Sequence, residues 1–572
     1  MLSVTSMPMA EPASAVEDAS LAGVSNPVYV VDQNHPKASD TNPGTAAAPW
    51  KTIGKAAATA KAGDTVCIMD GDYAERVKPA NSGVENKPIV FKGLPRQTVK
   101  MRGFDTTGCN YLSIESFFIT ATDVGVNVNS DHVEIVDNRF ENVETVPIDV
   151  PSSNTDKPAN IHVAFNEIYH CGKGMVTGGS NWLVERNEVN RLFCYDKGDA
   201  DYFRPWGTNM TFRQNYLHGS TKVEIKGSHT DCFQVFDDNG ELAQDILLEE
   251  NVCCDYGQNG LIMENHKPGN MKNFTVRRNI FPEYNPEWPH GGVGGSCPGF
   301  VVEGNTFVGG GHSFSTSSGC RFENNIFYCG VYWFTKTAQG FSSQKNLIYY
   351  TTEKVPVTGM SHIPTDYSKN VMNADPLFQD LAKRNVRVKK GSPVIAAGVD
   401  GVTIGALEYP NTYYVDARHA GASDENCGYA GAPYKTIAKA FSVAEEGETI
   451  IVRGGVYREL LKPTKSGVKV RSAKGEKVTI SCADEITDWK RQGDKWTAPL
   501  GTKPAKIFKD AQPFKEFSYD DAAKTIVVSG FDPRLCLMET VTRQNPIDLS
   551  RAPGMKIEGI EADARGAAGT VR

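Results

Sequence analysis

The sequence lacks several features that would place it in a familiar class. It has no run of about 18 apolar residues, so we expect no membrane-spanning helix. It has no excess of basic residues, because 60 Lys and Arg stand against 68 Asp and Glu, for a net charge of −8. This balance argues against nucleic acid as a partner. Its 54 glycines and 31 prolines are near average frequencies, which excludes collagen-like and low-complexity chains.

Cysteine spacing and the N-terminus add two further absences. The 13 cysteines include no C-x-x-C pair, so we expect no zinc site and interpret most of them as small buried apolar residues. Residues 1–26 lack both a basic segment and a proper apolar core. We therefore expect a disordered leader over 1–26, or a secretion signal that has been trimmed or mis-started. The remaining composition, 40% hydrophobic and 22% charged, is typical of a globular protein.

One stretch of the sequence occurs twice at a constant offset of 384 residues. Pro49-Trp-Lys-Thr-Ile53 returns as Pro433-Tyr-Lys-Thr-Ile437, and Gly63-Asp-Thr65 returns as Gly447-Glu-Thr449. Each copy predicts a short strand, a loop, an amphipathic helix and a second strand. In the first copy this helix falls within 50–62. The chain therefore contains two copies of one unit.

A second regularity lies between the two copies. Short alternating segments end in an asparagine followed by an apolar residue, and the asparagines recur every 20 to 36 residues. They are Asn138, Asn166, Asn187, Asn215, Asn251, Asn279, Asn305, Asn325 and Asn346. This period predicts an all-β fold, a right-handed parallel β-helix, with the 50–62 helix capping its N-terminal end. Asparagine suits the corners because it tolerates the left-handed conformation and because its amide can bond to the asparagine of the next rung.

The opening motif and the ending Ala374-Asp-Pro-Leu-Phe378 resemble the pectate-lyase-like right-handed parallel β-helix superfamily. The resemblance covers 27–409 and restarts near 411. We thus expect a β-helix domain over 27–409 and the start of a second, incomplete copy over 410–572. A small β insertion is expected at about 485–535. Because about three repeats are needed for a stable coil, we interpret the second copy as a gene fragment rather than an appendix.

The polar residues that could take part in catalysis or binding lie on three middle rungs of the predicted coil. Rungs stack about 4.8 Å apart, so carboxylates on adjacent rungs fall within reach of the separations that glycosidases use. We expect Asp231 and Glu264 to be the catalytic acid and base or nucleophile, with Asp201 assisting. His229 and Arg204 would orient the substrate. The other expected substrate-binding residues are Trp206, Gln234 and His266.

A lyase is the first alternative. The segment from Thr230 to Ile262 resembles the calcium-binding and catalytic region of family 9 pectate lyases, and Asp231 matches a calcium aspartate. However, Gln234 replaces the family's last calcium aspartate and Ile262 stands where its catalytic lysine would be. Calcium is therefore expected only if the enzyme is a lyase. Asp237 and Asp238 are more typical of a turn than of a metal loop.

These observations favour a secreted carbohydrate-active enzyme that cleaves glycosidic bonds, by hydrolysis rather than elimination. The alternatives are a pectate-like polysaccharide lyase and a noncatalytic glycan-binding β-helix. The expected partner is a polysaccharide or oligosaccharide, with no nucleic acid, no membrane span, no cofactor in the hydrolase case, and a monomeric state. The superfamily resemblance implies an extracellular or periplasmic location.

Overall fold

The fold was analysed in a computed structural model of the chain. It describes residues 28–151, 157–195, 199–238, 240–282, 292–295, 297–309, 312–315, 318–328, 331–334, 339–349, 369–552, 554–563 and 565. The leader predicted over 1–26 lies outside these residues. None of the helices in the described ranges is long and apolar enough to cross a membrane.

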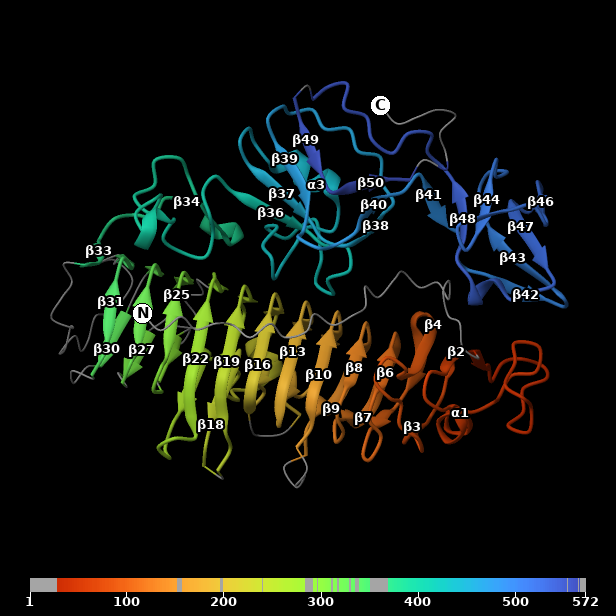
Figure 1. Cartoon of the computed structure of the whole chain (residues 1–572), viewed down its shortest axis with the longest axis horizontal. Helices are drawn as coiled ribbons and strands as arrows, with labels where there is room; N and C mark the ends of the chain where they lie inside the picture. Colours follow the sequence, from red (N-terminus) through yellow and green to blue (C-terminus); the bar gives the residue numbers. More distant parts are fainter. Residues whose placement is uncertain are drawn as a thin grey trace.

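The first part of the chain is a parallel coil of three sheets, in which each strand pairs in parallel with the strand one turn later (Figure 1). This confirms the predicted right-handed parallel β-helix, the hand that parallel crossovers adopt. The first sheet contains β1 (Val28–Val31), β2 (Thr65–Asp72), β4 (Ile89–Met101), β6 (Leu112–Glu115), β8 (Val133–Val136), β10 (Ala159–Ala164), β13 (Ser180–Glu185), β16 (Gly207–Arg213), β19 (Ala243–Glu249), β22 (Met271–Arg277), β25 (Val301–Glu303), β28 (Arg321–Glu323) and β31 (Ser342–Gln344).

The second and third sheets follow it around each turn. The second contains β9 (Arg139–Asp149), β11 (Glu167–Tyr169), β14 (Glu188–Asn190), β17 (Tyr216–His218), β20 (Val252–Cys253), β23 (Ile280–Phe281), β26 (Thr306–Val308), β29 (Ile326–Tyr328), β32 (Leu347–Tyr349) and β33 (Val371–Met372). The third contains β3 (Arg76–Val77), β5 (Gly103–Asp105), β12 (Met175–Val176), β15 (Phe203–Arg204), β18 (Phe233–Phe236), β21 (Asn259–Glu264), β24 (Gly292–Gly294), β27 (His312–Ser315) and β30 (Val331–Phe334). The long β7 (Phe117–Asn127) pairs with strands of both.

The interior of the coil is filled by buried apolar side chains, many of which stack on their equivalents in the next rung. Phe281, Phe307 and Phe327 form such a stack, with ring centroids 5.1 and 5.2 Å apart. Ten of the twelve cysteines in the described ranges are buried. This confirms their interpretation as small apolar core residues.

An unbroken ladder of asparagine side chains runs along the corner between the first and second sheets. Each amide donates to the side-chain oxygen of the asparagine one rung later, at 2.8 to 3.1 Å. The ladder extends from Asn138 to Asn370, one asparagine beyond the predicted set. The same side-chain oxygens also accept the backbone N–H of the preceding asparagine, as Asn215 does for Asn187 at 3.1 Å.

The reason given for asparagine at these corners needs one correction. The left-handed backbone conformation lies one residue earlier, for example at Arg186 (φ 55°), Gln214 (φ 55°) and Glu250 (φ 55°). The asparagines from Asn138 to Asn346 are themselves fully buried, and their amides also donate to strand carbonyls such as that of Val184. The residue before each one turns outward, away from the core.

The second copy folds as the duplication predicted. β36 (Thr412–Val415), β37 (Thr449–Val452), β39 (Lys469–Ser472) and β49 (Lys556–Glu558) form one parallel sheet, and β38 (Gly455–Tyr457), β40 (Val478–Ile480) and β50 (Ile560–Ala562) form another. Between β40 and β49 the chain forms two small antiparallel sheets. Their strands are β41 (Ala483–Glu485), β42 (Lys490–Gln492), β43 (Lys495–Pro499), β44 (Ile507–Lys509), β45 (Gln512–Phe514), β46 (Phe517–Asp520), β47 (Thr525–Ser529) and β48 (Met538–Val541). The hairpin of β34 (Phe378–Asp380) and β35 (Asn385–Val388) precedes the second copy.

The duplicated motif is explained by identical helix caps. Helix α1 (Ile53–Thr59) begins at Thr52, and α3 (Ile437–Val443) begins at Thr436, and both threonine hydroxyls accept the backbone N–H three residues later. In α1 the Glu75 carboxylate accepts the first two helical N–H groups, at 3.0 and 2.8 Å. Glu459 does the same for α3 at 2.9 Å. These caps satisfy N–H groups that a helix leaves free.

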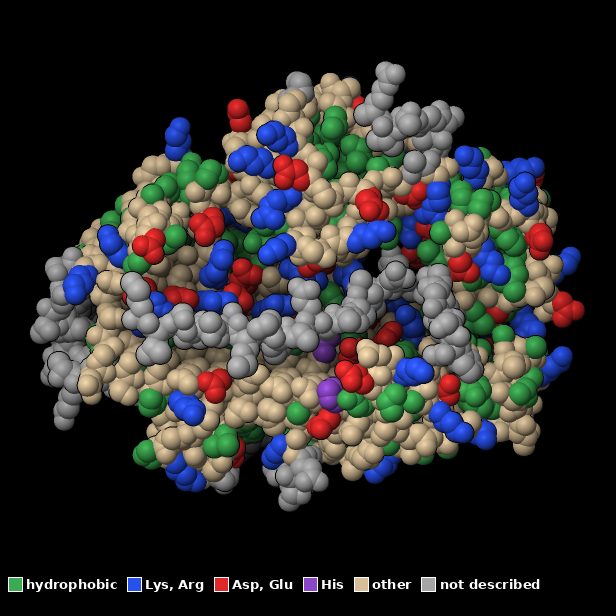
Figure 2. Space-filling model, in the orientation of Figure 1, with side chains coloured by type: hydrophobic (Ala, Val, Ile, Leu, Met, Phe, Trp, Pro, Cys, Tyr) green, Lys and Arg blue, Asp and Glu red, His purple; other side chains and the backbone are tan. Residues whose placement is uncertain are grey.

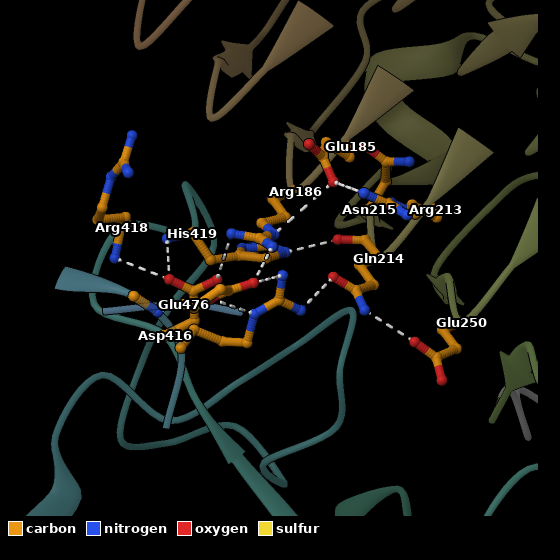
Figure 3. Close-up of polar contacts among 12 residues, drawn as sticks. Glu185, Arg186, Arg213, Gln214, Asn215, Glu250, Asp416, Arg418, His419 and Glu476 are labelled. Carbon is orange, nitrogen blue, oxygen red and sulfur yellow. Dashed lines mark hydrogen bonds and ion pairs between the residues drawn. The ribbon is translucent and has the colours of Figure 1, made fainter. Parts of the chain in front are cut away.

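The outward-turning corner residues dock the second copy against the coil (Figure 3). Arg186 donates to Glu476 at 3.1 Å and lies 3.7 Å from Asp416. Gln214 accepts from Arg453 at 2.7 Å through its side chain and from His419 at 2.8 Å through its backbone carbonyl. A second contact joins Arg534 to Asp32 and Asp70, both at 2.9 Å.

The ladder predicts a stability effect. Replacing Asn215 by Ala would leave the buried partners on both neighbouring rungs without hydrogen bonds, at about 1–3 kcal/mol for each unsatisfied group. Denaturant unfolding measures this loss. The matched control is Asn34→Ala, in which the amide removed is exposed and the expected change is below about 0.5 kcal/mol. Equal effects for the two variants would contradict the structural role of the ladder.

The docking contact predicts a second effect. Arg186→Ala would leave the buried Asp416 carboxylate without its closest cationic partner, at a cost of about 3–5 kcal/mol to docking. We expect the C-terminal unit to unfold in a separate, earlier transition and to become sensitive to limited proteolysis. Arg277→Ala is the control, because Arg277 pairs with Glu249 on the coil and both of these side chains are partly exposed. A single transition unchanged in Arg186→Ala would refute this assignment.

Candidate functional site

The predicted site residues lie on the outer face and corner of the third sheet, where β15, β18 and β21 stack. Asp201 and Asp231 occupy the same position on consecutive rungs, just before β15 and β18, and the backbone N–H of Asp231 donates to Asp201 Oδ1 at 3.0 Å. The next rung places Asn259 there, whose backbone and side-chain N–H groups donate to Asp231 Oδ1 at 2.7 and 2.8 Å. These three residues form a short second ladder.

Asp201 is buried and its second oxygen is bound by Arg204. Arg204 Nε and Nη2 lie 2.9 and 2.7 Å from Asp201 Oδ2, and Nη2 also binds Asp199 at 2.9 Å. Burial raises the pKa of Asp201, and the guanidinium of Arg204 opposes that rise. The geometry is that of a carboxylate held in one orientation by a bidentate partner.

Asp231 differs from Asp201 because one of its oxygens has no partner. Its side chain is 1% exposed, and Oδ2 accepts no hydrogen bond from any residue in the described part of the chain. Burial and the charge of Asp201 raise the pKa of Asp231 to about 7, and the hydrogen bonds from Asn259 oppose the shift. Two neighbouring carboxyls thus have different environments, as in pairs that divide acid and base roles.

Two further predicted residues, Trp206 and Gln234, lie beside this pair. The Arg204 guanidinium lies 5.8 Å from the Trp206 ring centroid and 5.4 Å from that of Phe236. Trp206 is half-buried, and its Nε1 donates to the Phe236 carbonyl at 3.1 Å. Gln234, 6% exposed, has an Oε1 without a partner among the described residues. Unpaired buried acceptors are uncommon in proteins and often mark functional sites.

The structure does not bring Glu264 to the same place. It is the exposed last residue of β21 and lies in register with Phe236. Glu264 lies five positions after Asn259, the residue that binds Asp231, which corresponds to about 16 Å of extended strand. Glu264 and Asp231 are thus too far apart to act on one glycosidic bond. His229 and His266 are both exposed.

Asp237 stabilises a turn. Its carboxylate accepts the backbone N–H groups of His266 and Lys267, both at 2.8 Å. Burial acts to raise the pKa of Asp237, but these amide hydrogen bonds lower it below its ordinary value. Asp238 is exposed and lies 3.6 Å from the His266 ring.

The residues present do not fit a calcium ion. Calcium takes six to eight oxygen ligands, whereas here both Asp201 oxygens and one Asp231 oxygen are already engaged. Within the described ranges, no group of three or more His, Cys, Asp or Glu side chains is arranged to hold a metal ion.

Sequence reasoning missed Lys173. Gly174, which follows it, donates its N–H to the Asp201 carbonyl at 3.0 Å, so Lys173 lies one rung before Asp201. Burial and the positive charge of Arg204 lower the pKa of Lys173. No motif in the sequence marks this lysine, because its relation to Asp201 depends on the register of two rungs. We call Lys173, Asp201, Arg204, Trp206 and Asp231 the polar strip.

The geometry defines a parallel β-helix protein with a polar strip on one sheet, and the superfamily resemblance is confirmed at the level of fold. Among known proteins, residues 37–92 match the family model of a protein of unknown function, DUF1565. The uncharacterized protein YwoF of Bacillus subtilis (strain 168) is 30% identical over 132 residues, 19% of this chain. The chain spans 28% of the length of that relative.

Three solved structures resemble the chain distantly. Pectate lyase Pel9A is 13% identical, with 68% of this chain and 98% of that chain covered and a TM-score of 0.38. The family 6 polysaccharide lyase Pedsa3628 from Pseudopedobacter saltans is 13% identical, with 59% and 94% covered and a TM-score of 0.37. The family 136 lacto-N-biosidase from Eubacterium ramulus is 10% identical, with 57% and 68% covered and a TM-score of 0.35.

The raised pKa of Asp231 predicts a pH effect on stability. Because the folded pKa of about 7 exceeds the ordinary value of 3.8, the folded state holds a proton that the unfolded state releases between these pH values. The contribution of the Asp231 carboxyl to the free energy of unfolding is therefore fully present below about pH 4 and is lost as the pH rises to about 7. We expect the wild type to lose a few kcal/mol relative to Asp231→Asn between pH 4 and pH 8, as measured by denaturant unfolding. The exposed Asp238→Asn should follow the wild type, and parallel curves for all three proteins would contradict the shift.

Proposed function

We propose that the protein is a polysaccharide-degrading enzyme that cleaves glycosidic bonds at the polar strip by hydrolysis. Asp231 acts as the general acid and gives its proton to the glycosidic oxygen as the bond breaks. Asp201, held by Arg204, is the carboxylate that stabilises the positive charge on the sugar. The observation that supports this most directly is the unpaired Oδ2 of Asp231, on a carboxyl whose pKa of about 7 keeps it partly protonated near neutral pH.

The surroundings of the acid support a saccharide substrate. Trp206 offers a half-buried ring beside a fixed guanidinium, and sugar rings stack on such surfaces while their hydroxyls bond to charged groups. The outer face of a β-helix also suits an extended chain, because equivalent positions recur on every rung. Glu264, His229 and His266 are exposed on the rim of this region and are proposed to contact sugars away from the cleaved bond. A polymeric substrate implies action outside the cytoplasm.

Lys173 favours elimination as a second candidate. The pKa of Lys173 is lowered, and its amine would be the base that takes the C5 proton of a uronic acid, after which the C4–O bond breaks and a double bond forms. Arg204, adjacent to it, would pair with the uronate carboxylate. This lysine supplies the base that the sequence comparison with family 9 pectate lyases found missing at Ile262.

One experiment distinguishes the two reactions. Polysaccharides of plant and algal origin are incubated with the protein, and the products are analysed by mass spectrometry. Hydrolysis adds one water per cut and elimination adds none. If hydrolysis is correct, Asp231→Asn lowers kcat by about 100-fold or more and Lys173→Met leaves the product mass unchanged. The control Asp238→Asn retains full activity. Binding without any turnover would contradict both candidates and indicate a glycan-binding protein.

A further inference from the structure

A cleft lies between the coil and the C-terminal unit, and one of the docking contacts forms part of its wall. The cleft has a volume of about 1000 Å³, and Figure 2 shows the hollow with charged side chains on its walls. The coil contributes Lys92 to the lining, and the C-terminal unit contributes Trp489. His419 also lines the cleft, and it makes the docking contact with Gln214. A change at His419 therefore acts both on docking and on the width of the cleft.

The hydrogen-bond partners of the His419 ring fix its protonation state. Its Nε2 lies 2.8 Å from the backbone carbonyl oxygen of Gln214, which can only accept, so Nε2 carries the proton (Figure 3). Its Nδ1 lies 2.9 Å from the backbone nitrogen of Gly421, whose N–H can only donate. Nδ1 is therefore an unprotonated acceptor, and the docked ring is a neutral imidazole. A second proton on Nδ1 would place two donors against each other.

The coil covers the His419 ring and keeps water from it. His419 is 3% exposed. The next turn of the loop lies so close to the coil that a Cβ on Gly421 would be 2.9 Å from Tyr216 Cδ1 and 3.4 Å from Glu188 Cδ. Burial lowers the pKa of His419 to about 4, although the Gln214 carbonyl and the charge of Glu188 oppose this shift. An imidazolium ion in this place would lack both an acceptor and hydration.

The charged groups of the coil near His419 do not supply the missing acceptor. Arg186 and His218 add to the lowering of the His419 pKa, because a positive charge nearby disfavours a second one. Glu188 acts in the opposite direction, but its Oε1 is engaged by His218 Nε2 at 2.8 Å. The coil side of the contact therefore favours the neutral ring.

The C-terminal unit contributes its own charged groups to this contact. They are Asp416, Arg418, Arg453 and Glu476. Asp416 Oδ1 accepts the backbone N–H groups of Arg418 and His419, at 3.1 and 3.2 Å. Burial raises the pKa of Asp416, and the guanidinium of Arg186 opposes that rise. Asp416 thus favours docking in acid, which is opposite to the effect of His419, so a test must isolate the histidine.

We propose that His419 is a pH-sensitive switch for docking: the neutral imidazole holds the C-terminal unit against the coil, and protonation releases this contact and widens the cleft. In the docked state the added proton has no acceptor, whereas in the released state water accepts it. Because burial lowers the pKa of the docked ring, the contribution of His419 to docking is fully present above about pH 6.5 and is lost as the pH falls toward 4. The switch does not depend on the reaction proposed for the polar strip.

The test measures docking in the full chain by hydrogen exchange and mass spectrometry at pH 8 and pH 5. The reporter is the segment 418–422, in which the Ala420 N–H donates to the Arg186 carbonyl across the contact at 3.4 Å. Protection factors remove the intrinsic pH dependence of exchange. The comparison variant is His419→Gln, whose amide does not titrate and can still donate to the Gln214 carbonyl. Between pH 8 and pH 5 we expect protection in the wild type to fall by about 30-fold relative to this variant, from pKa values of about 4 and 6.5.

A control and a second measurement make the test decisive. His229→Gln removes an exposed imidazole from the coil and should keep the wild-type response to pH. Exchange at the ring C2–H of His419 reports its titration in the unsubstituted protein, which we expect below about pH 5. The proposal is wrong if this ring titrates near 6.5, or if the wild type and His419→Gln lose protection equally. Where His419→Gln fails to dock even at pH 8, the ring titration alone decides.

Discussion

The asparagine ladder is the interaction on which the rest of the structure depends. At every turn of the coil the chain must leave one sheet and enter the next, and the corner leaves backbone amides and carbonyls inside the protein without strand partners. An asparagine inside the ladder bonds to the asparagines of both neighbouring rungs and to a strand carbonyl of the rung before it, as Asn215 does with Asn187, Asn251 and the Val184 carbonyl. Because unpaired buried polar groups are costly, the ladder fixes the register of successive rungs. The same register then aligns all other positions of one rung with those of the next.

The ladder also determines where the second copy binds. The residue before each asparagine adopts the left-handed conformation, so its side chain turns outward at a regular interval along one edge of the coil. Arg186 and Gln214 occupy two such positions and make the principal contacts with the C-terminal unit. Phe165 occupies another, and the Arg418 guanidinium lies 4.4 Å from its ring. Each corner thus has an inner asparagine that joins successive rungs and an outer residue whose side chain is not part of the ladder.

Much of the fold could be predicted from the sequence because its causes are local or periodic. The asparagine spacing reflects the length of each turn, and the duplicated Pro-Trp/Tyr-Lys-Thr-Ile motif reflects a helix cap that recurs in full, including Glu75 and Glu459. Asp40 and Asp424 complete both caps by accepting the N–H and hydroxyl of the N-terminal threonine, and they too stand 384 residues apart. They lie in loops without a recognisable pattern, so only the structure assigns them a role.

The candidate sites were harder to predict because they depend on register between rungs and on docking between copies. Alternation along a strand indicated that Asp201 and Asp231 lie together, since both precede a short third-sheet strand. It gave no means of placing Glu264, whose position at the far end of β21 is set by pairing with β18. The cleft between the two copies could not be predicted either, because residues from both copies line it.

The second copy therefore has a physical role that its sequence does not indicate. A short stack of rungs buries little apolar surface, and repeats of this kind gain stability from their neighbours. Here the neighbour is the flank of the first coil rather than a further rung, and the contact is made by ion pairs and hydrogen bonds such as Arg186 with Glu476. Because charged contacts leave gaps that a packed apolar interface would fill, docking of this kind preserves a polar cleft. The duplication thus yields a surface that a single β-helix, open along its whole flank, does not have.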